Sequence, residues 1–117
     1  MIYLDSDFLV NYFVVQNKDS NRIAIKKFEK LYETNQAFIS LLALQEVSFV
    51  LSKLRMETFQ IEENLISIQK LAKVNFDQYE FKRAQYLASK IGFQNINDCL
   101  HLAIAESHCK ELYTFTH

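Results

Sequence analysis

Short apolar runs alternate with longer amphipathic segments along this 117-residue chain, and that alternation limits the possible folds more than any other feature. Strands are expected at residues 2–4, 37–39, 73–76 and 112–115. Parallel strands need a crossover between them, usually a helix, and a sheet connected in this way is covered on both faces. The sequence therefore predicts a three-layer α/β/α fold with a central parallel sheet, in one domain spanning residues 1–117.

The segments between the apolar runs have helical periodicity and good capping residues. Helices are expected at residues 8–15, 20–34, 40–54, 57–72, 78–91 and 97–110. N-caps are expected at Ser20 or Asn21, Ser40, Asp77 and Asn97. Asp77 and Glu80 have the form of a capping box, and Gly92 is well placed to end the helix that follows.

Composition narrows the class of protein. A single glycine and no proline leave little material for long irregular loops. No apolar run approaches the roughly 20 residues that a membrane-spanning helix needs, and the start of the chain lacks the basic region of a signal peptide. A cytoplasmic protein without membrane association is therefore expected. The net charge of −1 gives no broadly basic surface, so any contact with nucleic acid depends on a local basic patch and bound metal.

Three acidic residues occur where apolar segments would be expected to continue. Asp5 ends the first apolar run, Glu46 interrupts the stretch 39–54, and Asp98 opens the stretch 100–105. A buried carboxylate is costly unless a cation or hydrogen bonds compensate its charge. Acids from distant segments with no fixed basic partner suggest a divalent metal site, since Mg²⁺ and Mn²⁺ take oxygen ligands of this kind.

The expected fold brings these acids toward one place. Ligands of open parallel sheets bind at the carboxyl ends of the strands, and Asp5 and Asp98 lie at or just after such positions. One or two Mg²⁺ or Mn²⁺ ions held there would activate water and clamp the oxygens of an in-line phosphoryl displacement. Taken singly, Asp5 or Asp98 is more simply a helix cap, whereas the apolar neighbours of Glu46 leave few solvent-facing positions. His101 lies one turn after Asp98 on the same helix face, from which it could approach the site, but it is better interpreted as a packed helix histidine.

Four segments together resemble the PIN-domain nucleases, and especially the small VapC-type toxins of bacterial toxin–antitoxin pairs. The segment 2–10, IYLDSDFLV, is similar to the family's opening motif. The segment 39–47, ISLLALQEV, is similar to the second motif, whose glutamate falls at Glu46. The segment 97–105, NDCLHLAIA, and the final strand, LYTF at 112–115, are similar to the third and fourth. The resemblance runs essentially from end to end.

This resemblance implies an Mg²⁺- or Mn²⁺-dependent endoribonuclease that cuts single-stranded or loop RNA and leaves a 5′-phosphate and a 3′-hydroxyl. The implied metal ligands and catalytic residues are Asp5, Glu46 and Asp98. The implied supporting residues around them are Ser6, Asp7, Thr114 and Thr116. Members of the family often form homodimers and are inhibited by a small antitoxin protein whose C-terminal segment crosses the active site.

One position departs from the family pattern. An aspartate commonly follows the last strand where this chain has Thr116, and the sequence stops at His117, before the family's usual final strand and helix. A truncated C-terminus, a site with three acids and an impaired site all fit this departure. A PIN fold that binds RNA or protein without cutting is therefore an alternative. A haloacid-dehalogenase-type phosphatase is a weaker alternative, because Asp5 could be its nucleophile but Asp98 lacks an acidic neighbour.

Replacing Thr116 by aspartate tests the fourth motif. With three acids the site carries less negative charge and should bind Mn²⁺ weakly, so Thr116→Asp should tighten Mn²⁺ binding and raise the rate of RNA cleavage. Titration calorimetry with Mn²⁺ and the initial cleavage rate measure the two effects, with Thr116→Asn as the uncharged control. If Thr116→Asp leaves metal dependence and rate unchanged, the fourth acid is not limiting.

Overall fold

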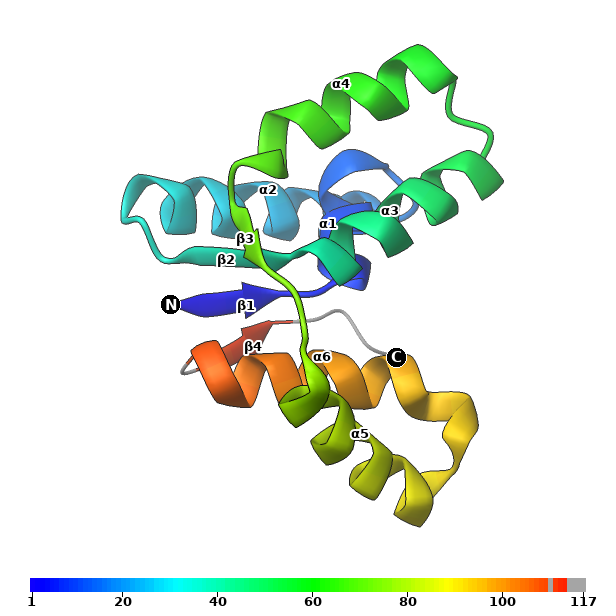
Figure 1. The fold of residues 1–117 in the computed structure, drawn as a ribbon. Helices are drawn as coiled ribbons and strands as arrows, with labels where there is room; N and C mark the ends of the chain where they lie inside the picture. The colour runs from blue at the N-terminus through cyan, green and yellow to red at the C-terminus, as the bar shows by residue number, and fades with distance from the viewer. Residues whose placement is uncertain (110, 114–117) are drawn as a thin grey trace.

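The computed structural model describes residues 1–109 and 111–113, and its strands form one parallel sheet (Figure 1). The strands are β1 (Ile2–Leu4), β2 (Ala37–Ser40), β3 (Ala72–Val74) and β4 (Glu111–Tyr113). Their order in the sheet is β3-β2-β1-β4, and every neighbouring pair is parallel. The predicted parallel sheet is confirmed, although residues 114 and 115 of the last predicted strand lie outside the described part.

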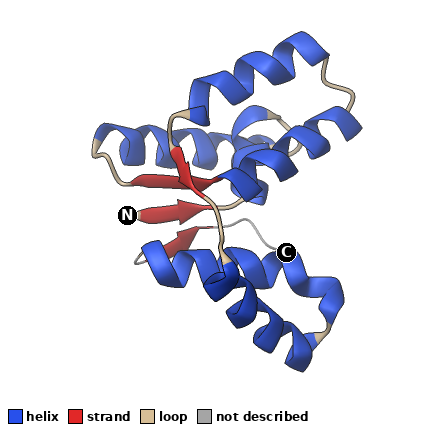
Figure 2. Cartoon of the chain, viewed as in Figure 1, coloured by secondary structure: helices blue, strands red, loops and turns tan. Residues whose placement is uncertain are grey.

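Helices cover both faces of this sheet. They are α1 (Ser6–Phe13), α2 (Lys18–Glu33), α3 (Leu41–Lys53), α4 (Thr58–Gln69), α5 (Gln78–Ile91) and α6 (Ile96–His108), with a 3-10 turn η1 (Phe93–Asn95). Helices α1 to α4 lie on one side of the strands, and α5 and α6 lie on the other (Figures 1 and 2). The α/β/α layering predicted from the sequence is confirmed. None of the helices in the described ranges is long and apolar enough to cross a membrane.

Strand β1 is central and positions the functional edge of the sheet. Tyr3 is opposite Phe38 of β2 on one side and opposite Leu112 of β4 on the other. Tyr3 and Leu4 are fully buried as a result. Because neighbouring strands are parallel, their carboxyl ends meet at one edge, and the chain leaves β1 there through Asp5.

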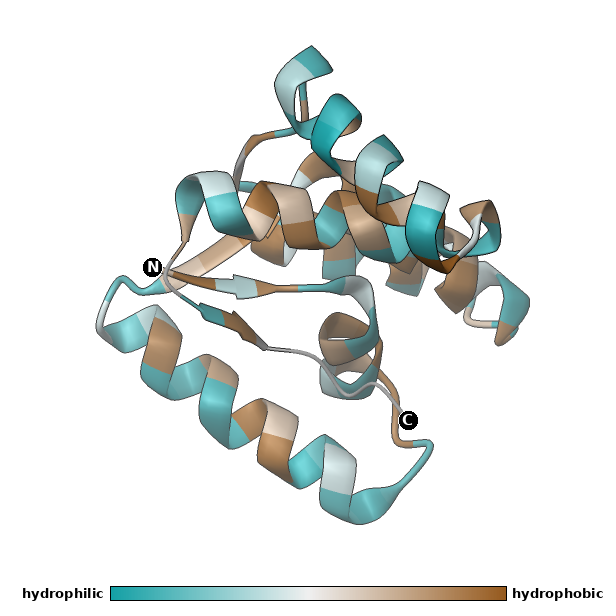
Figure 3. Ribbon diagram, turned by 90° about the horizontal axis from the view of Figure 1, so that it is seen from below, coloured by the Kyte–Doolittle hydropathy of each residue, from teal (hydrophilic) through white to brown (hydrophobic). Residues whose placement is uncertain are grey.

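Two groups of apolar side chains hold the layers together. The larger joins the sheet to α1–α4 and includes Leu4, Phe8, Ile39 and Val47. On the other side, small residues such as Ala84 of α5 let this helix approach α6 closely. Hydrophobic and hydrophilic residues alternate along the helices, as expected when one face of each helix packs on its neighbours (Figure 3).

Two predicted caps are confirmed. The Ser40 hydroxyl accepts a hydrogen bond from the backbone N–H of Ala43 at 3.1 Å, which starts α3 directly after β2. The Asp77 carboxylate accepts from the N–H of Tyr79 at 2.8 Å, and Glu80 accepts from the N–H of Asp77 at 2.9 Å. These contacts satisfy N–H groups that have no partner within the helix.

Other predicted boundaries were wrong. Helix α2 begins at Lys18, because the side chain of Asn17 already caps it by accepting from Ser20 N–H at 3.0 Å. Helix α6 begins at Ile96, so Asn97 lies in its first turn and is not its cap. The sequence pattern did not indicate the turn η1, which ends at Asn95. Helix α6 follows it directly and so begins earlier than predicted. Strand β3 likewise begins and ends earlier than predicted.

Gly92 is expected to be essential for the sharp exit from α5. Its φ is 109° and its ψ is 138°, a conformation nearly restricted to glycine. Gly92→Ala should therefore lower the free energy of unfolding by about 1–3 kcal/mol. Urea denaturation measures the loss, with Gln85→Ala at an exposed position of α5 as the control. Equal stability of the two variants would show that the backbone at residue 92 relaxes.

Candidate active site

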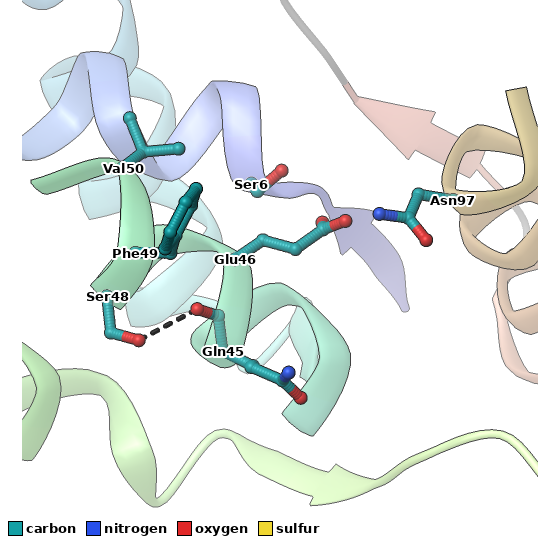
Figure 4. A pocket seen from close by; sticks show the side chains of 7 residues that line it. All are labelled: Ser6, Gln45, Glu46, Ser48, Phe49, Val50 and Asn97. Atoms are coloured by element: carbon teal, nitrogen blue, oxygen red, sulfur yellow. Dashed lines mark hydrogen bonds between the residues drawn. The ribbon is translucent and has the colours of Figure 1, made fainter. Parts of the chain in front are cut away.

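A pocket of about 620 Å³ opens between the start of α1, just after β1, the middle of α3 and the first turn of α6 (Figure 4). Its walls come from α1, α3 and α6, which are distant in sequence and meet at the carboxyl edge of the sheet. The lining residues are Ser6, Gln45, Glu46, Ser48, Phe49, Val50 and Asn97. The predicted location of the site, at the ends of the strands, therefore coincides with a pocket.

Asp5 is held rigidly at this edge. It follows β1 directly, is largely buried, and caps α1 by accepting a hydrogen bond from the N–H of Phe8 at 3.1 Å. The predicted role of Asp5 as a helix cap is therefore confirmed, and its predicted role as a metal ligand stays a prediction. Ser6 follows it and lines the pocket.

Glu46 projects into the pocket from the second turn of α3. Its carboxylate extends between Ser6 and Asn97, and the Asn97 side chain points toward it (Figure 4). One oxygen, Oε1, lies 2.5 Å from Nε2 of His101. Among the described residues the other oxygen, Oε2, has no hydrogen-bond partner. The prediction that Glu46 does not simply point to solvent is confirmed.

Asp7 and Asp98 do not line the pocket. Asp98 is in the first turn of α6 but is exposed, and its neighbour Asn97 is the one that lines the pocket. Asp7 is exposed in the first turn of α1. Thr114 and Thr116 lie outside the described residues, so their predicted supporting roles remain predictions.

The structure does not gather the three acids into one cluster. Within the described ranges, no group of three or more histidine, cysteine or acidic side chains is placed to hold a metal ion. Neighbouring carboxylates repel one another when no cation lies between them. Ser6, Glu46 and Asn97 line the pocket with side-chain oxygens, and Asp5 directly precedes Ser6 in the sequence. Oxygen donors of this kind suit a hard cation such as Mg²⁺ or Mn²⁺. The chemistry of the site therefore fits the predicted metal, and the ligand assignment stays a prediction.

A chain of buried polar side chains behind the pocket was not predicted. The Tyr3 hydroxyl lies 2.7 Å from Oγ of Ser40 and 2.6 Å from Nδ1 of His101, and His101 contacts Glu46 through its other ring nitrogen. His101 is packed, as expected, but it also contacts the site. Its position three residues after Asp98, within an apolar run, was the available signal.

The surroundings of Tyr3 favour its neutral form. Burial is the main cause that raises the pKa of its hydroxyl far above the usual value, and the negative charges of Asp5 and Glu46 raise it further. The hydrogen bond with Ser40 opposes this shift but does not reverse it. Tyr3 therefore keeps its proton and can donate it to a neighbouring acceptor.

Comparison with protein families decides the identity of the fold. The family model described as the PIN domain matches residues 2–115. The chain belongs to the PIN domain family. A comparison with curated proteins found no match. Among solved structures, the chain is similar to VapC20 from Mycobacterium tuberculosis, described as a toxin that cleaves the sarcin–ricin loop. That match has a TM-score of 0.72 at 14% identity and covers 99% of this chain and 90% of the other.

The PIN domain match covers every residue that lines the pocket. The match includes the segments that contribute Asp5, Glu46 and Asp98, which is the region where the sequence resemblance placed the metal ligands. The phosphatase interpretation of Asp5 loses its basis, because it depended on a different α/β fold. At 14% identity the similarity to VapC20 supports the fold alone.

Ser40 should stabilise this PIN domain more than an ordinary helix cap. Its hydroxyl is fully buried and forms hydrogen bonds with both the N–H of Ala43 and the Tyr3 hydroxyl. Because Ser40→Ala removes both bonds, it should lower the free energy of unfolding by about 1–3 kcal/mol. Asn17→Ala removes an exposed cap and should cost about 1 kcal/mol or less. Urea denaturation of both variants makes the comparison. Equal losses would show that the buried contact with Tyr3 contributes nothing.

Proposed function

We propose that this PIN-domain protein is an Mg²⁺- or Mn²⁺-dependent endoribonuclease. The observation that carries the proposal is the Glu46 carboxylate, which faces a pocket at the carboxyl edge of the sheet beside Asp5 and the first turn of α6. Family membership supports nuclease chemistry at this position. The oxygen-rich lining supports a hard divalent cation.

Asp5, Glu46 and Asp98 would hold the cation, with Ser6 and Asn97 at the margin of the site. A divalent cation supplies activation of the attacking water and neutralises charge on the scissile phosphate. The protein's own contribution is to hold the carboxylates in position. Asp5 is fixed by its capping contact and Glu46 by His101, whereas Asp98 lies on an exposed turn and would have to reorient.

The shape of the pocket supports single-stranded or loop RNA as the substrate. One wall carries Phe49, whose side chain is 62% exposed although it is a large apolar group. An exposed aromatic ring beside oxygen ligands can stack on an unpaired base while the phosphate approaches the acids. Bases in a continuous duplex are already stacked and would not reach it.

A toxin role follows as part of the same proposal. The likeness of the fold to VapC20 and the resemblance of four sequence segments to VapC-type toxins support a toxin of a type II pair, acting as a homodimer and inhibited by a cognate antitoxin protein. The sarcin–ricin loop, which is named as the target of VapC20, is one candidate substrate. Growth arrest on expression, relieved by a small protein encoded beside it, would test this role.

One observation favours a second candidate function. The Asp98 side chain is exposed and does not line the pocket, and Thr116 stands where the family commonly has an acid. A PIN fold that binds RNA or a protein partner without cleaving would tolerate both features. RNA binding that persists without any metal-dependent cleavage would support this candidate.

Substitutions that keep shape but remove charge test the proposed chemistry. Asp5→Asn, Glu46→Gln and Asp98→Asn should each reduce Mg²⁺-dependent RNA cleavage by at least about 100-fold, because the amide keeps the shape of the side chain but removes the negative charge that attracts the cation. Initial rates on a labelled stem-loop RNA measure the effect. Glu62→Gln, at an exposed position of α4, is the matched control and should cleave at the unmodified rate.

The folded state must be checked beside the rates. Thermal unfolding of each variant should stay close to that of the unmodified protein, with Asp5→Asn permitted a small loss because it caps α1. Undiminished cleavage by Asp5→Asn and Glu46→Gln would rule out the ligand assignment. Undiminished cleavage by Asp98→Asn alone would show that α6 contributes no acid to the site.

A further inference from the structure

His101 connects the interior of the protein to the Glu46 carboxylate. The histidine belongs to α6, is only 4% exposed, and has both ring nitrogens within hydrogen-bond distance of another side chain. Nδ1 lies 2.6 Å from the Tyr3 hydroxyl, and Nε2 lies 2.5 Å from Oε1 of Glu46. These contacts join α6, β1 and α3, three elements that are distant along the chain.

The direction of each hydrogen bond follows from its partners. An ionised carboxylate only accepts, so Nε2 of His101 carries a proton and donates it to Glu46. In the tautomer with this proton on Nε2, Nδ1 is an acceptor, and the Tyr3 hydroxyl, which keeps its own proton, donates to it. Its oxygen then accepts from the Ser40 hydroxyl, whose own oxygen accepts from the N–H of Ala43. Every donor in this series of hydrogen bonds has an acceptor, and the series ends at the Glu46 carboxylate.

We propose that His101 is a positioning residue for the metal site, fixing Oε1 of Glu46 so that Oε2 is presented to the pocket. This inference rests on the proposed function and adds a residue to it. The Glu46 side chain has several rotatable bonds, and ordering such a side chain costs free energy when a ligand binds. A donor already in place removes part of that cost before the cation arrives.

A purely structural role would not require this arrangement. The surrounding positions of α6 are apolar, with Leu100, Ala103 and Ile104 buried beside His101. A leucine would fill the same interior position without a polar group that needs partners. The histidine instead contributes one hydrogen bond to the core and one to the residue that lines the pocket.

Metal affinity tests the inference without using activity. Titration calorimetry with Mn²⁺ alone should show binding by the unmodified chain and about 10-fold weaker binding by His101→Leu. His101→Gln should retain most of the affinity, because its amide nitrogen can take the place of Nε2. His108→Leu is the matched control, since the same substitution on α6 replaces an exposed histidine that stacks on Phe38, and it should bind Mn²⁺ normally.

Two further measurements separate positioning from general damage to the fold. Tyr3→Phe removes the donor to Nδ1 and should weaken Mn²⁺ binding in the same direction but less. Combining His101→Leu with Glu46→Gln should cost no more affinity than Glu46→Gln alone, because His101 acts through Glu46. In the metal-free protein, ¹⁵N NMR of the imidazole should show a proton on Nε2 of His101.

The outcomes distinguish this inference from the proposed function. An unprotonated Nε2, an unchanged affinity in His101→Leu, or additive losses in the double variant would each overturn the positioning role while leaving the nuclease proposal intact. An affinity loss in His101→Leu that His101→Gln does not relieve would assign the effect to packing and also overturn it. If the unmodified chain neither binds Mn²⁺ nor cleaves RNA, the proposed function fails and this role fails with it.

Discussion

A tyrosine hydroxyl at the centre of a buried parallel strand must be hydrogen-bonded, and much of this protein is arranged around that requirement. Leaving such a group without a partner would cost about 1–3 kcal/mol. The Tyr3 hydroxyl meets Ser40, where β2 ends and α3 begins, and His101 of α6. One side chain of β1 thereby connects the central sheet to the helical layer on each of its faces, which aligns the elements that carry the candidate site residues.

The pocket is a consequence of that alignment. Helix α3 starts at Ser40 directly after its strand, so its second turn brings Glu46 to the edge where β1 ends at Asp5. Helix α6 approaches the same edge from the other layer and contributes Asn97 to the lining. Because three segments that are distant in sequence meet there, a small shift of any one of them changes the distances among the acids.

Charge explains why such a site would depend on a cation. The protein has a net charge of −1, and its candidate site is built from acids that would repel a phosphate backbone. A divalent ion bound there would reverse the local charge and would provide the attraction for phosphate that a broadly basic surface otherwise supplies. The exposed ring of Phe49 at the pocket adds a contact that does not depend on charge.

The sequence alone determined the parallel α/β fold, because apolar runs, helical periods and the caps at Ser40 and Asp77 are local signals. It also singled out Asp5 and Glu46, whose charges interrupt apolar segments. The start of α6, the exposure of Asp98 and the contacts of His101 were decided only by tertiary structure. A histidine in an apolar run carries no sign of its partners, since they come from β1 and α3, nearly a hundred and more than fifty residues away. Their meeting depends on how the layers pack, which no local pattern records.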